Sequence, residues 1–181
     1  MQIIVTANIT ITTKRGKKMK EMFCFQCQQT AHNVACDGKV GVCGKKSDTA
    51  NFQDELTGAL IGLARASKSG NPTEKTDVLI LKGLFTTITN VNFNDVTIKK
   101  MKTEVEQEKS RVNAEKFEDY DMNMIWDAHE DIRSLKSLIL FGIKGMAAYA
   151  YHAYALGKTD RTVTDFVYED LYAQGEDKYP D

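Results

Sequence analysis

Proline and excess charge are both scarce in this sequence of 181 residues. Only two prolines occur, Pro72 and Pro180, which favours long helices over a chain full of turns. The formal net charge is −1, so the composition gives no reason to expect nucleic acid or an anionic membrane as a partner. An internal repeat, a low-complexity tract and a glycine-rich phosphate loop are also missing from the sequence. What remains is an ordinary globular composition, of one domain or two small ones.

Long apolar runs are missing as well. The most apolar stretch, within residues 127–156, is interrupted by Lys144 and His152 and falls short of the roughly 18 uninterrupted residues of a membrane span. Residues 1–18 are not typical of a secretory signal, because the basic run 14–18 follows the apolar part instead of leading it. We therefore expect no membrane partner and a reducing, intracellular setting.

The chain has no cysteine after residue 43, and its four cysteines all fall within twenty residues: Cys24, Cys27, Cys36 and Cys43. Their spacing is C-x2-C-x8-C-x6-C. Four thiolates are the usual ligand count of one tetrahedral metal ion or one iron–sulfur cluster. Two disulfides would suit a small secreted protein, but this chain is long enough to build a core without them. The spacing therefore predicts an inorganic centre held by this loop.

Two kinds of centre compete for these cysteines. Zinc ribbons usually offer two tight C-x2-C pairs, and only the first pair is tight here. An iron–sulfur cluster is larger than one ion, so its ligands can come from a loop that wraps around it, although the spacing matches neither common ferredoxin pattern. Gly38, Gly41 and Gly44 could let backbone amides approach sulfur, or could be ordinary turn glycines. The residues favour iron–sulfur and leave zinc open.

Helical periodicity begins after the cysteine loop. Apolar residues spaced three and four apart predict a helix from Asp48, taken as its N-cap, to about Lys68. A second helix is expected after Thr73, with Val78, Leu81, Leu84, Phe85 and Ile88 buried. A third, polar helix is expected over 95–113 behind Asn94, with a narrow seam of Val96, Ile98, Met101 and Val105.

The second half of the chain predicts two more helices. Residues 116–126 are typical of a loop or linker, and 127–156 give the longest helical pattern, ending at Gly157. A last helix is expected behind Thr162 or Thr164, with Val163, Phe166, Val167 and Leu171 inward. The fold class is therefore all-α: helical bundles preceded by an irregular Cys-rich loop. We divide the chain into an extension (1–21), the cluster-binding loop (22–47) and the bundle (48–181).

The extension before the loop does not match the rest of the chain. Residues 1–13 are rich in β-branched side chains, and a basic run follows. Arg15-Gly16-Lys17 can be encoded by a sequence that resembles a ribosome-binding site shortly before Met19. We therefore expect 1–21 to be disordered or a misassigned start, with Met19 or Met22 as the initiator.

Several other residues could carry chemistry but have simpler roles. We interpret His32 as a loop histidine and His152 as a packing residue on a helix face. The polar group Asp127, His129, Glu130 and Asp131 suits a helix start, where such residues cap the backbone. Trp126, Tyr149, Tyr151 and Tyr154 could line an electron path, but core packing is the simpler expectation.

Two segments resemble the hybrid-cluster protein family, also called prismane proteins or hydroxylamine reductases. The first is 22–31 (MFCFQCQQTA), followed by Cys36 and by 41–45 (GVCGK). The second is 131–142 (DIRSLKSLILFG), which continues through 144–152 (KGMAAYAYH). The resemblance runs from about residue 22 to the end, and residues 1–18 have no counterpart in it.

This resemblance implies a helical N-terminal domain in which Cys24, Cys27, Cys36 and Cys43 bind a [4Fe-4S] cluster; the short x8 spacer is similar to the cubane branch of the family. The cluster would pass electrons, received from an electron-donor protein, to a hybrid [4Fe-2O-2S] cluster that reduces hydroxylamine to ammonia or acts on nitric oxide. The hybrid cluster is bound by later α/β domains through His, Glu and Cys residues. Because no cysteine follows Cys43, we expect the hybrid cluster only in a full-length protein and assign no catalytic residue here.

Two alternatives of different classes stay open at this point. One is a free-standing iron–sulfur carrier or sensor. The other is a structural zinc protein, with the metal bound by all four cysteines and a helical interaction surface. Metal content separates the second from both cluster hypotheses, and exposed apolar surface separates a piece of a larger enzyme from a free-standing carrier.

Overall fold

The computed structural model describes residues 21–88 and 92–176 of the chain. Within these ranges it contains no strand, and the predicted all-α class is confirmed. The start-site hypothesis depends on residues 1–20, which lie outside the described residues. The elements are η1 (Ala31–Asn33), a 3-10 turn, and the helices α1 (Ser47–Ser69), α2 (Glu74–Thr86), α3 (Asp95–Val112), α4 (Asn123–Trp126), α5 (Glu130–Ala155) and α6 (Arg161–Gln174).

Two of the predicted helix starts are confirmed by their capping bonds. At α2, the Thr76 hydroxyl accepts a hydrogen bond from the Thr73 backbone N–H at 2.9 Å. At α3, the Asn94 side-chain oxygen accepts from the Thr97 N–H at 3.1 Å. Each bond satisfies a backbone donor that the first helical turn leaves without a partner, which is why these residues fix where the helices begin.

The other three starts differ from the prediction. Helix α1 begins at Ser47, so Asp48 lies in its first turn instead of capping it. Helix α6 is capped by Asp160, whose side chain accepts from the Thr162 N–H at 2.8 Å. Helix α5 begins only at Glu130, because His129 is its N-cap. In α6 the N-cap is therefore Asp160 and not Thr162 or Thr164, whereas α5 is capped by a member of the predicted polar group and starts later than residue 127.

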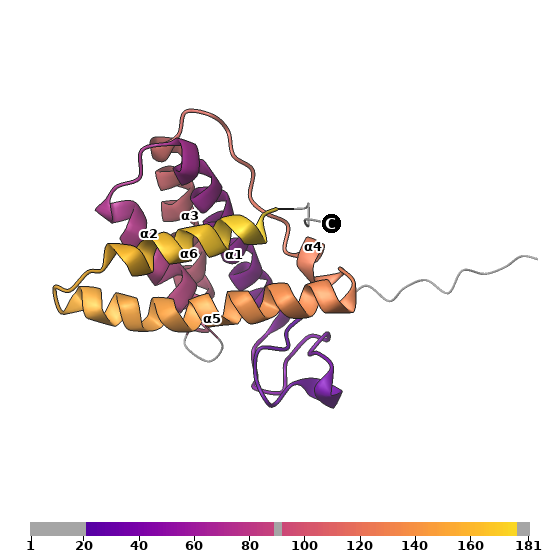
Figure 1. Ribbon diagram of the computed structural model, residues 1–181. Coiled ribbons are helices and arrows are strands. Elements are labelled where there is room, and N and C mark those ends of the chain that lie inside the picture. The colour runs from indigo at the N-terminus through magenta and orange to yellow at the C-terminus, as the bar shows by residue number, and fades with distance from the viewer. Residues whose placement is uncertain (1–20, 89–91, 177–181) are drawn as a thin grey trace, which may run out of the picture.

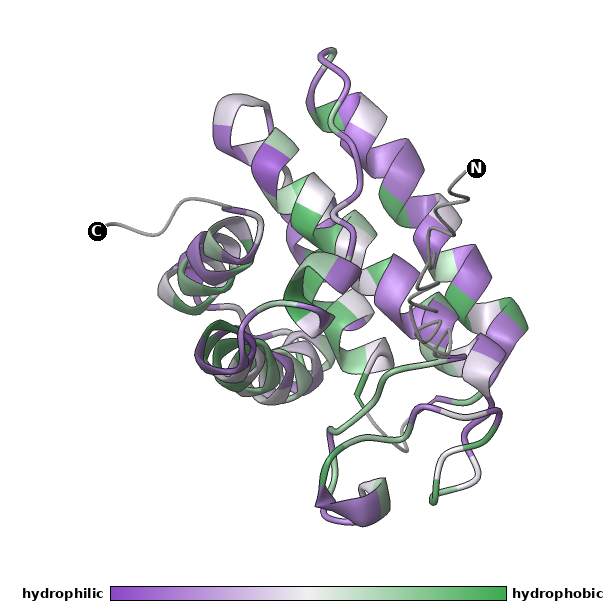
Figure 2. Ribbon diagram, turned by 90° about the vertical axis from the view of Figure 1, so that its right-hand side faces the viewer, coloured by the Kyte–Doolittle hydropathy of each residue, from purple (hydrophilic) through white to green (hydrophobic). Residues whose placement is uncertain are grey.

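Helix α1 is the centre of the fold and contacts α2, α3 and α6. Helices α5 and α6 pack side by side and lie across the α1–α2 pair, with α5 against α2 (Figure 1). The cysteine loop extends from the N-terminal end of α1 and lies outside this packed group (Figures 1 and 2). The molecule is therefore a helical bundle with one irregular loop attached at its edge.

Two glycines on α1 allow the segment that precedes α4 to cross close to this helix. A side chain at Gly58 would place its Cβ 2.1 Å from the Tyr120 carbonyl oxygen, and one at Gly62 would meet the Glu118 carbonyl oxygen at 3.0 Å. The Tyr120 N–H donates to the Gly58 carbonyl at 3.1 Å. The segment before α4 therefore packs directly against the α1 backbone. This segment leads the chain from α3 back toward the cysteine loop.

Burial differs from the predicted helix faces at several places. Leu79 and Ile80 of α2 are buried although they lie outside the predicted stripe, because α2 is enclosed by α1, α3 and α5. Val96 and Phe166, predicted inward, are exposed. The predicted linker 116–126 contains the four-residue helix α4.

In the described part of the chain, no helix combines the length and the apolar character that a membrane crossing requires.

Candidate metal centre

The cysteine loop is held by two short antiparallel contacts. Cys24 and Cys36 exchange backbone hydrogen bonds of 3.0 and 2.8 Å, so the first and third cysteines lie on neighbouring segments. A second contact joins Val40 to Lys46 and returns the chain to α1. Between its two sides, the loop turns through Cys43. Backbone pairing thus brings Cys24 beside Cys36, and it does not join Cys27 or Cys43 to them in the described residues.

Tight turns set the conformation around the other two cysteines. The Cys27 carbonyl accepts from the Thr30 hydroxyl at 2.6 Å and from the Thr30 N–H at 3.2 Å. After Cys43, Gly44 has φ of +86°, a conformation that favours glycine, and its N–H donates to the Gly41 carbonyl at 2.9 Å. Of the three loop glycines, Gly44 is therefore required by its turn.

The four cysteines are all free thiols. Cys36 is buried, and Cys24, Cys27 and Cys43 are partly exposed. Burial raises the pKa of the Cys24 thiol, and the positive charge of Lys45 opposes that rise. Among the described residues, no group of three or more His, Cys, Asp or Glu side chains is arranged to hold a metal ion. By its chemistry, the set of four thiols in one loop fits an iron–sulfur cluster.

Aromatic side chains separate the loop from the bundle. Phe23 and Phe25, on either side of Cys24, pack edge to face with centroids 5.3 Å apart. Trp126 of α4 contacts both rings, at 5.6 and 5.8 Å, and Phe141 of α5 contacts Phe25 at 5.7 Å. The prediction that Trp126 is a packing residue agrees with its burial. This aromatic wall fixes Cys24 relative to α4 and α5.

A buried lysine lies directly behind Cys24. Lys45 is 1% exposed, and its Nζ donates to Gln53 Oε1 of α1 at 2.8 Å. The same Nζ lies 3.9 Å from Cys24 Sγ, within reach of a hydrogen bond to sulfur. Lys45 therefore connects the cysteine loop to α1 and places a positive charge beside a candidate ligand.

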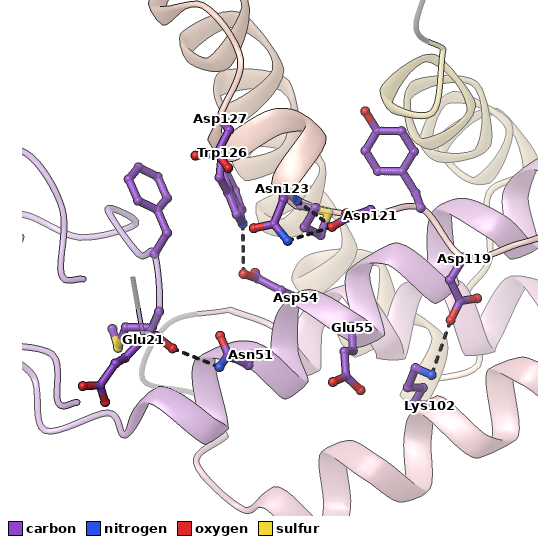
Figure 3. A pocket seen from close by; sticks show the side chains of 14 residues that line it. Glu21, Asn51, Asp54, Glu55, Lys102, Asp119, Asp121, Asn123, Trp126 and Asp127 are labelled. Atoms are coloured by element: carbon purple, nitrogen blue, oxygen red, sulfur yellow. Dashed lines mark hydrogen bonds and ion pairs between the residues drawn. The ribbon is translucent and has the colours of Figure 1, made fainter. Parts of the chain in front are cut away.

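Two further charged groups, the partly buried Asp54 and the buried Lys144, lie in this region. Asp54 of α1 accepts a hydrogen bond from Trp126 Nε1 at 2.9 Å (Figure 3). Burial raises the pKa of Asp54 to about 6, against the opposing effects of the Trp126 bond, Lys144 and Lys45. Burial likewise lowers the pKa of Lys144 on α5 to about 8, with Asp54 opposing the change. Strongly shifted groups of this kind are typical of functional sites, although structural ion pairs produce them too.

A cavity of about 780 Å³ opens beside the loop, and Asp54 lies on its wall. Figure 3 shows that its labelled side chains come from the loop, α1, α3 and the segment through α4. Carboxylates dominate the lining, offset by Lys102, which pairs with Asp119 at 3.4 Å. The acidic members are Glu21, Asp54, Glu55, Asp119, Asp121 and Asp127.

The four cysteines as ligands stay a prediction from the sequence, and sequence reasoning did not point to the charged groups around them, the buried Lys45 and Lys144 and the partly buried Asp54. Lys45 follows Cys43 by two residues, and Lys144 was noticed only as an interruption of an apolar stretch. Asp54 occupies a helix position between apolar residues with no motif around it. No sequence pattern marks any of the three as buried. The nearest signal was that 41–45 (GVCGK) forms part of a recognisable motif.

The remaining candidates lie away from the cysteines or have structural roles. His32 is exposed within η1, with φ of 55°. The Nδ1 atom of His129 accepts from the Asp131 N–H at 3.4 Å, in keeping with the predicted capping role. His152 packs edge to face on Phe85 at 5.2 Å. Tyr149, expected in the core, is 83% exposed and contradicts that expectation.

Comparison with known proteins adds the family. The sequence model of the Prismane/CO dehydrogenase family matches residues 22–180. A hydroxylamine reductase of Caldanaerobacter subterraneus is 38% identical over 81% of this chain and 32% of its own length. Those of Acetivibrio thermocellus and Methanocella arvoryzae are 37% and 38% identical, over 86% and 87% of this chain and 33% and 35% of their own lengths. The chain spans about a third of the length of these curated relatives.

Proposed function

The chain belongs to the Prismane/CO dehydrogenase family, and we propose that it is the electron-relay portion of a hydroxylamine-reductase-type enzyme of the cytoplasm. Its cysteine loop holds a [4Fe-4S] cluster. When bound, the cluster supplies reversible one-electron transfer. The observation that carries the proposal is that all four cysteines lie on one backbone-paired loop, within the part of the chain that the family model matches.

In this proposal Cys24, Cys27, Cys36 and Cys43 are the cluster ligands. The backbone pairing of Cys24 with Cys36 orients two of them from adjacent segments, and the turn at Gly44 presents a third. The aromatic wall of Phe23, Phe25, Trp126 and Phe141 shields this side of the site from water. A lower local dielectric increases the effect of nearby charges on a redox centre.

Reduction of hydroxylamine to ammonia, or action on nitric oxide, would belong to a hybrid [4Fe-2O-2S] cluster held by further α/β domains of a full-length protein. The chain offers no cysteine after Cys43 for such a centre. We accordingly propose no catalytic residue here. An electron-donor protein would supply the electrons.

The further domains are also the partner that we propose for α5. Its outward side carries large apolar residues that are mostly uncovered, and side chains at Gly142 and Gly145 would meet open space. The chain accounts for only about a third of its relatives' length, so two thirds of such a protein is available to cover this face. The exposed apolar residues are Leu135, Leu138, Ile139, Met146, Tyr149 and Leu156.

Anaerobic purification and metal analysis test the cluster. We expect brown protein with about four iron and four labile sulfide per chain. Cys→Ser at any of the four positions should lower both contents severalfold while the far-ultraviolet circular dichroism of the helices is retained. As a matched control, Thr30→Ser near Cys27 should keep both iron and sulfide. One zinc per colourless chain would overturn the proposal in favour of a structural zinc site.

The exposed face of α5 separates a portion of an enzyme from a free-standing carrier. A chain made to work inside a larger protein should self-associate when produced alone, and Leu138→Lys with Leu135→Lys should reduce that association, because the variants place charge on the apolar face. A monodisperse, fully soluble, cluster-loaded chain would instead favour an independent electron carrier or sensor. Light scattering under anaerobic conditions measures the difference.

A further inference from the structure

Lys45 is the buried charge that the helical packing does not explain. Its side chain is 1% exposed, yet its closest partner is the neutral Gln53 amide, at 2.8 Å. In the described ranges, no carboxylate forms an ion pair with it. Removing an ammonium from water is costly unless it is paired and fully hydrogen-bonded. One neutral acceptor leaves most of that cost uncompensated.

The other buried cation of this region, Lys144, has a carboxylate of opposite charge near it. Asp54 and Lys144 each oppose the effect of burial on the pKa of the other. Lys45 therefore leaves a net positive charge behind the cysteine loop. Asp54 acts on Lys45 only without a direct ion pair. The groups near Nζ are the Gln53 amide, the Phe93 ring at 5.9 Å from its centroid and Cys24 Sγ at 3.9 Å, and of these only the sulfur can carry a negative charge.

We propose that Lys45 is a positioning residue for the redox centre, which donates a hydrogen bond to the Cys24 thiolate and raises the reduction potential of the cluster bound there. This inference rests on the proposed function. Hydrogen bonds to cysteine sulfur and nearby positive charge are general means of tuning iron–sulfur potentials. Gln53 holds the ammonium in place from the rigid helix α1, and Gln53 Nε2 is itself fixed by the Asn92 carbonyl at 3.0 Å.

The direction of the effect follows from charge. One-electron reduction by an external one-electron donor adds one negative charge at the site, and no thiolate bond is made or broken. The Lys45 ammonium attracts the reduced state more strongly than the oxidised state. Because the side chain is excluded from water, solvent and salt screen this attraction less than they would at the surface.

The test is an anaerobic potentiometric titration of the full chain after reconstitution with iron and sulfide, followed by visible absorption and electron paramagnetic resonance. Lys45→Met should lower the equilibrium constant for reduction at least tenfold, which is about 59 mV for one electron. Lys46→Met is the matched control: Lys46 is the next residue, is exposed, and makes no side-chain capping bond to α1. The equilibrium constant for reduction should change by less than twofold in Lys46→Met.

Equal potentials in the two variants would overturn the inference, provided that both retain iron. If Lys45→Met fails to assemble the cluster, Gln53→Leu replaces it as the test. This variant keeps the charge and removes the acceptor that holds Nζ, so a threefold or larger fall in the same constant is expected, and an unchanged constant overturns the inference. Absence of a cluster from the unaltered chain overturns the proposed function itself, which the iron and sulfide analysis detects before any titration.

Discussion

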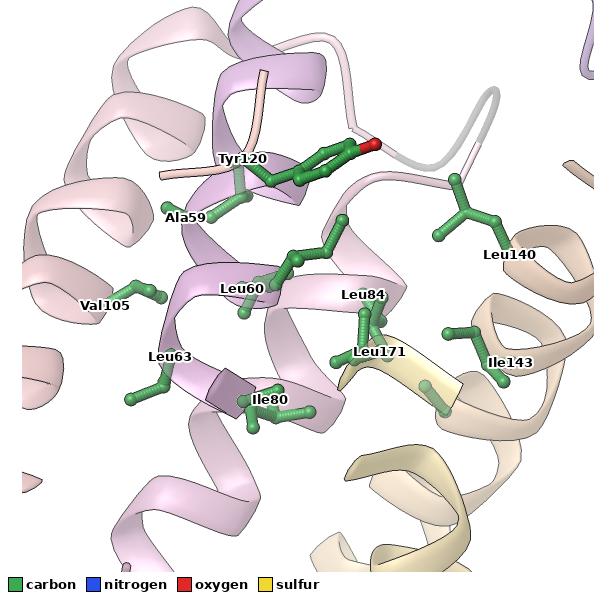
Figure 4. Close-up of a cluster of buried hydrophobic side chains, with 14 of the residues drawn as sticks. Ala59, Leu60, Leu63, Ile80, Leu84, Val105, Tyr120, Leu140, Ile143 and Leu171 are labelled. Carbon is green, nitrogen blue, oxygen red and sulfur yellow. The ribbon is translucent and has the colours of Figure 1, made fainter. Parts of the chain in front are cut away.

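The interior of the bundle and the surroundings of the cysteine loop are stabilised by different interactions. Figure 4 shows the bundle core, where side chains of α1, α2, α5 and α6 converge around Leu60 and Leu84, both fully buried. The buried cluster of the loop has only three members, Met22, Cys36 and Ala50. Apolar burial stabilises the bundle without a metal, whereas the loop depends on a few backbone bonds and on whatever it binds.

The same contrast appears in how each region buries a carboxylate. Glu108 of α3 is bonded by Arg111 at 2.6 Å and by the Thr76 hydroxyl of α2 at 2.7 Å. These partners, Arg111 foremost, lower the pKa of Glu108 to about 2. Asp54 near the loop has its pKa raised to about 6 instead, by burial. The Glu108 charge is thus satisfied by its partners, whereas the Asp54 charge is held at a cost to stability.

This difference is informative about function. A satisfied ion network such as that of Glu108 has a structural explanation, since it joins α2 to α3. Asp54 likewise joins α1 to α4 through Trp126, but burial makes its charge unfavourable, and charges near a bound redox group tune the potential of that group. This unfavourable charge therefore lies in the region that we propose for electron transfer.

The largest expected effect on the free energy of unfolding comes from a substitution in the bundle core. Leu60→Ala should lower the free energy of unfolding by about 2–5 kcal/mol, because it removes a fully buried side chain that packs against the α2 backbone at Gly83. Val42→Ala in the loop, where the side chain is 61% exposed, should change it by less than about 0.5 kcal/mol. Urea unfolding followed by circular dichroism measures both. Equal effects would mean that loop and bundle do not differ as described.

The bundle was more predictable from sequence than the site. Five of the six helices follow from apolar spacing, and Thr73 and Asn94 were correctly placed as caps because their bonds are local. The buried faces of the helices were less predictable. Helix α2 is enclosed on several sides, whereas a single apolar stripe in the sequence predicts burial on one side only. Phe166 and Tyr149 were assigned inward, but they are 47% and 83% exposed in the described structure.

At the site, the four cysteines were singled out because four thiols within twenty residues form a local sequence pattern, and their role as ligands stays a prediction. Lys45 and Asp54 were not singled out, because their burial depends on how α1 packs under the loop and on Trp126, which follows Asp54 by more than seventy residues. Long-range contacts of this kind leave no local pattern. The aromatic wall likewise joins Phe25 to Phe141, two residues whose proximity only the tertiary structure reveals.

The next largest effect on the free energy of unfolding should come from the Glu108 carboxylate, whose charge is satisfied by its partners. Glu108→Gln should lower the free energy of unfolding by about 1.5–3 kcal/mol near neutral pH, because it removes charge-assisted bonds from a buried position. The folded-state pKa lies below that of the unfolded chain, so this stabilisation is present above pH 4.5 and is lost as the pH falls toward 2. The variant should lack that acid-dependent loss. Glu115→Gln, on an exposed segment, is the control and should keep it.

The smallest expected effect is that of Asp54, which should make the free energy of unfolding depend on pH in the direction opposite to that of Glu108. Asp54 has a folded-state pKa of about 6, above its ordinary value of 3.8, so the folded state binds the extra proton between these values. The free energy of unfolding should therefore fall as the pH rises from about 4 to about 6, by about 1 kcal/mol, because the adjoining cavity lets solvent reduce the full cost of the charge.

Asp54→Asn isolates this contribution. The amide oxygen can still accept from Trp126 Nε1, but it carries no charge at any of these pH values. Urea unfolding of the metal-free chain between pH 4 and 6.5 should show the fall in the unaltered protein and in the exposed control Asp37→Asn, and a flatter dependence in Asp54→Asn. Measurements stay below pH 7 because Lys144, whose pKa is lowered to about 8, would otherwise titrate as well. If Asp54→Asn kept the full fall, the charge near the loop would be as well satisfied as that of Glu108, and the contrast between the two regions would reduce to apolar packing alone.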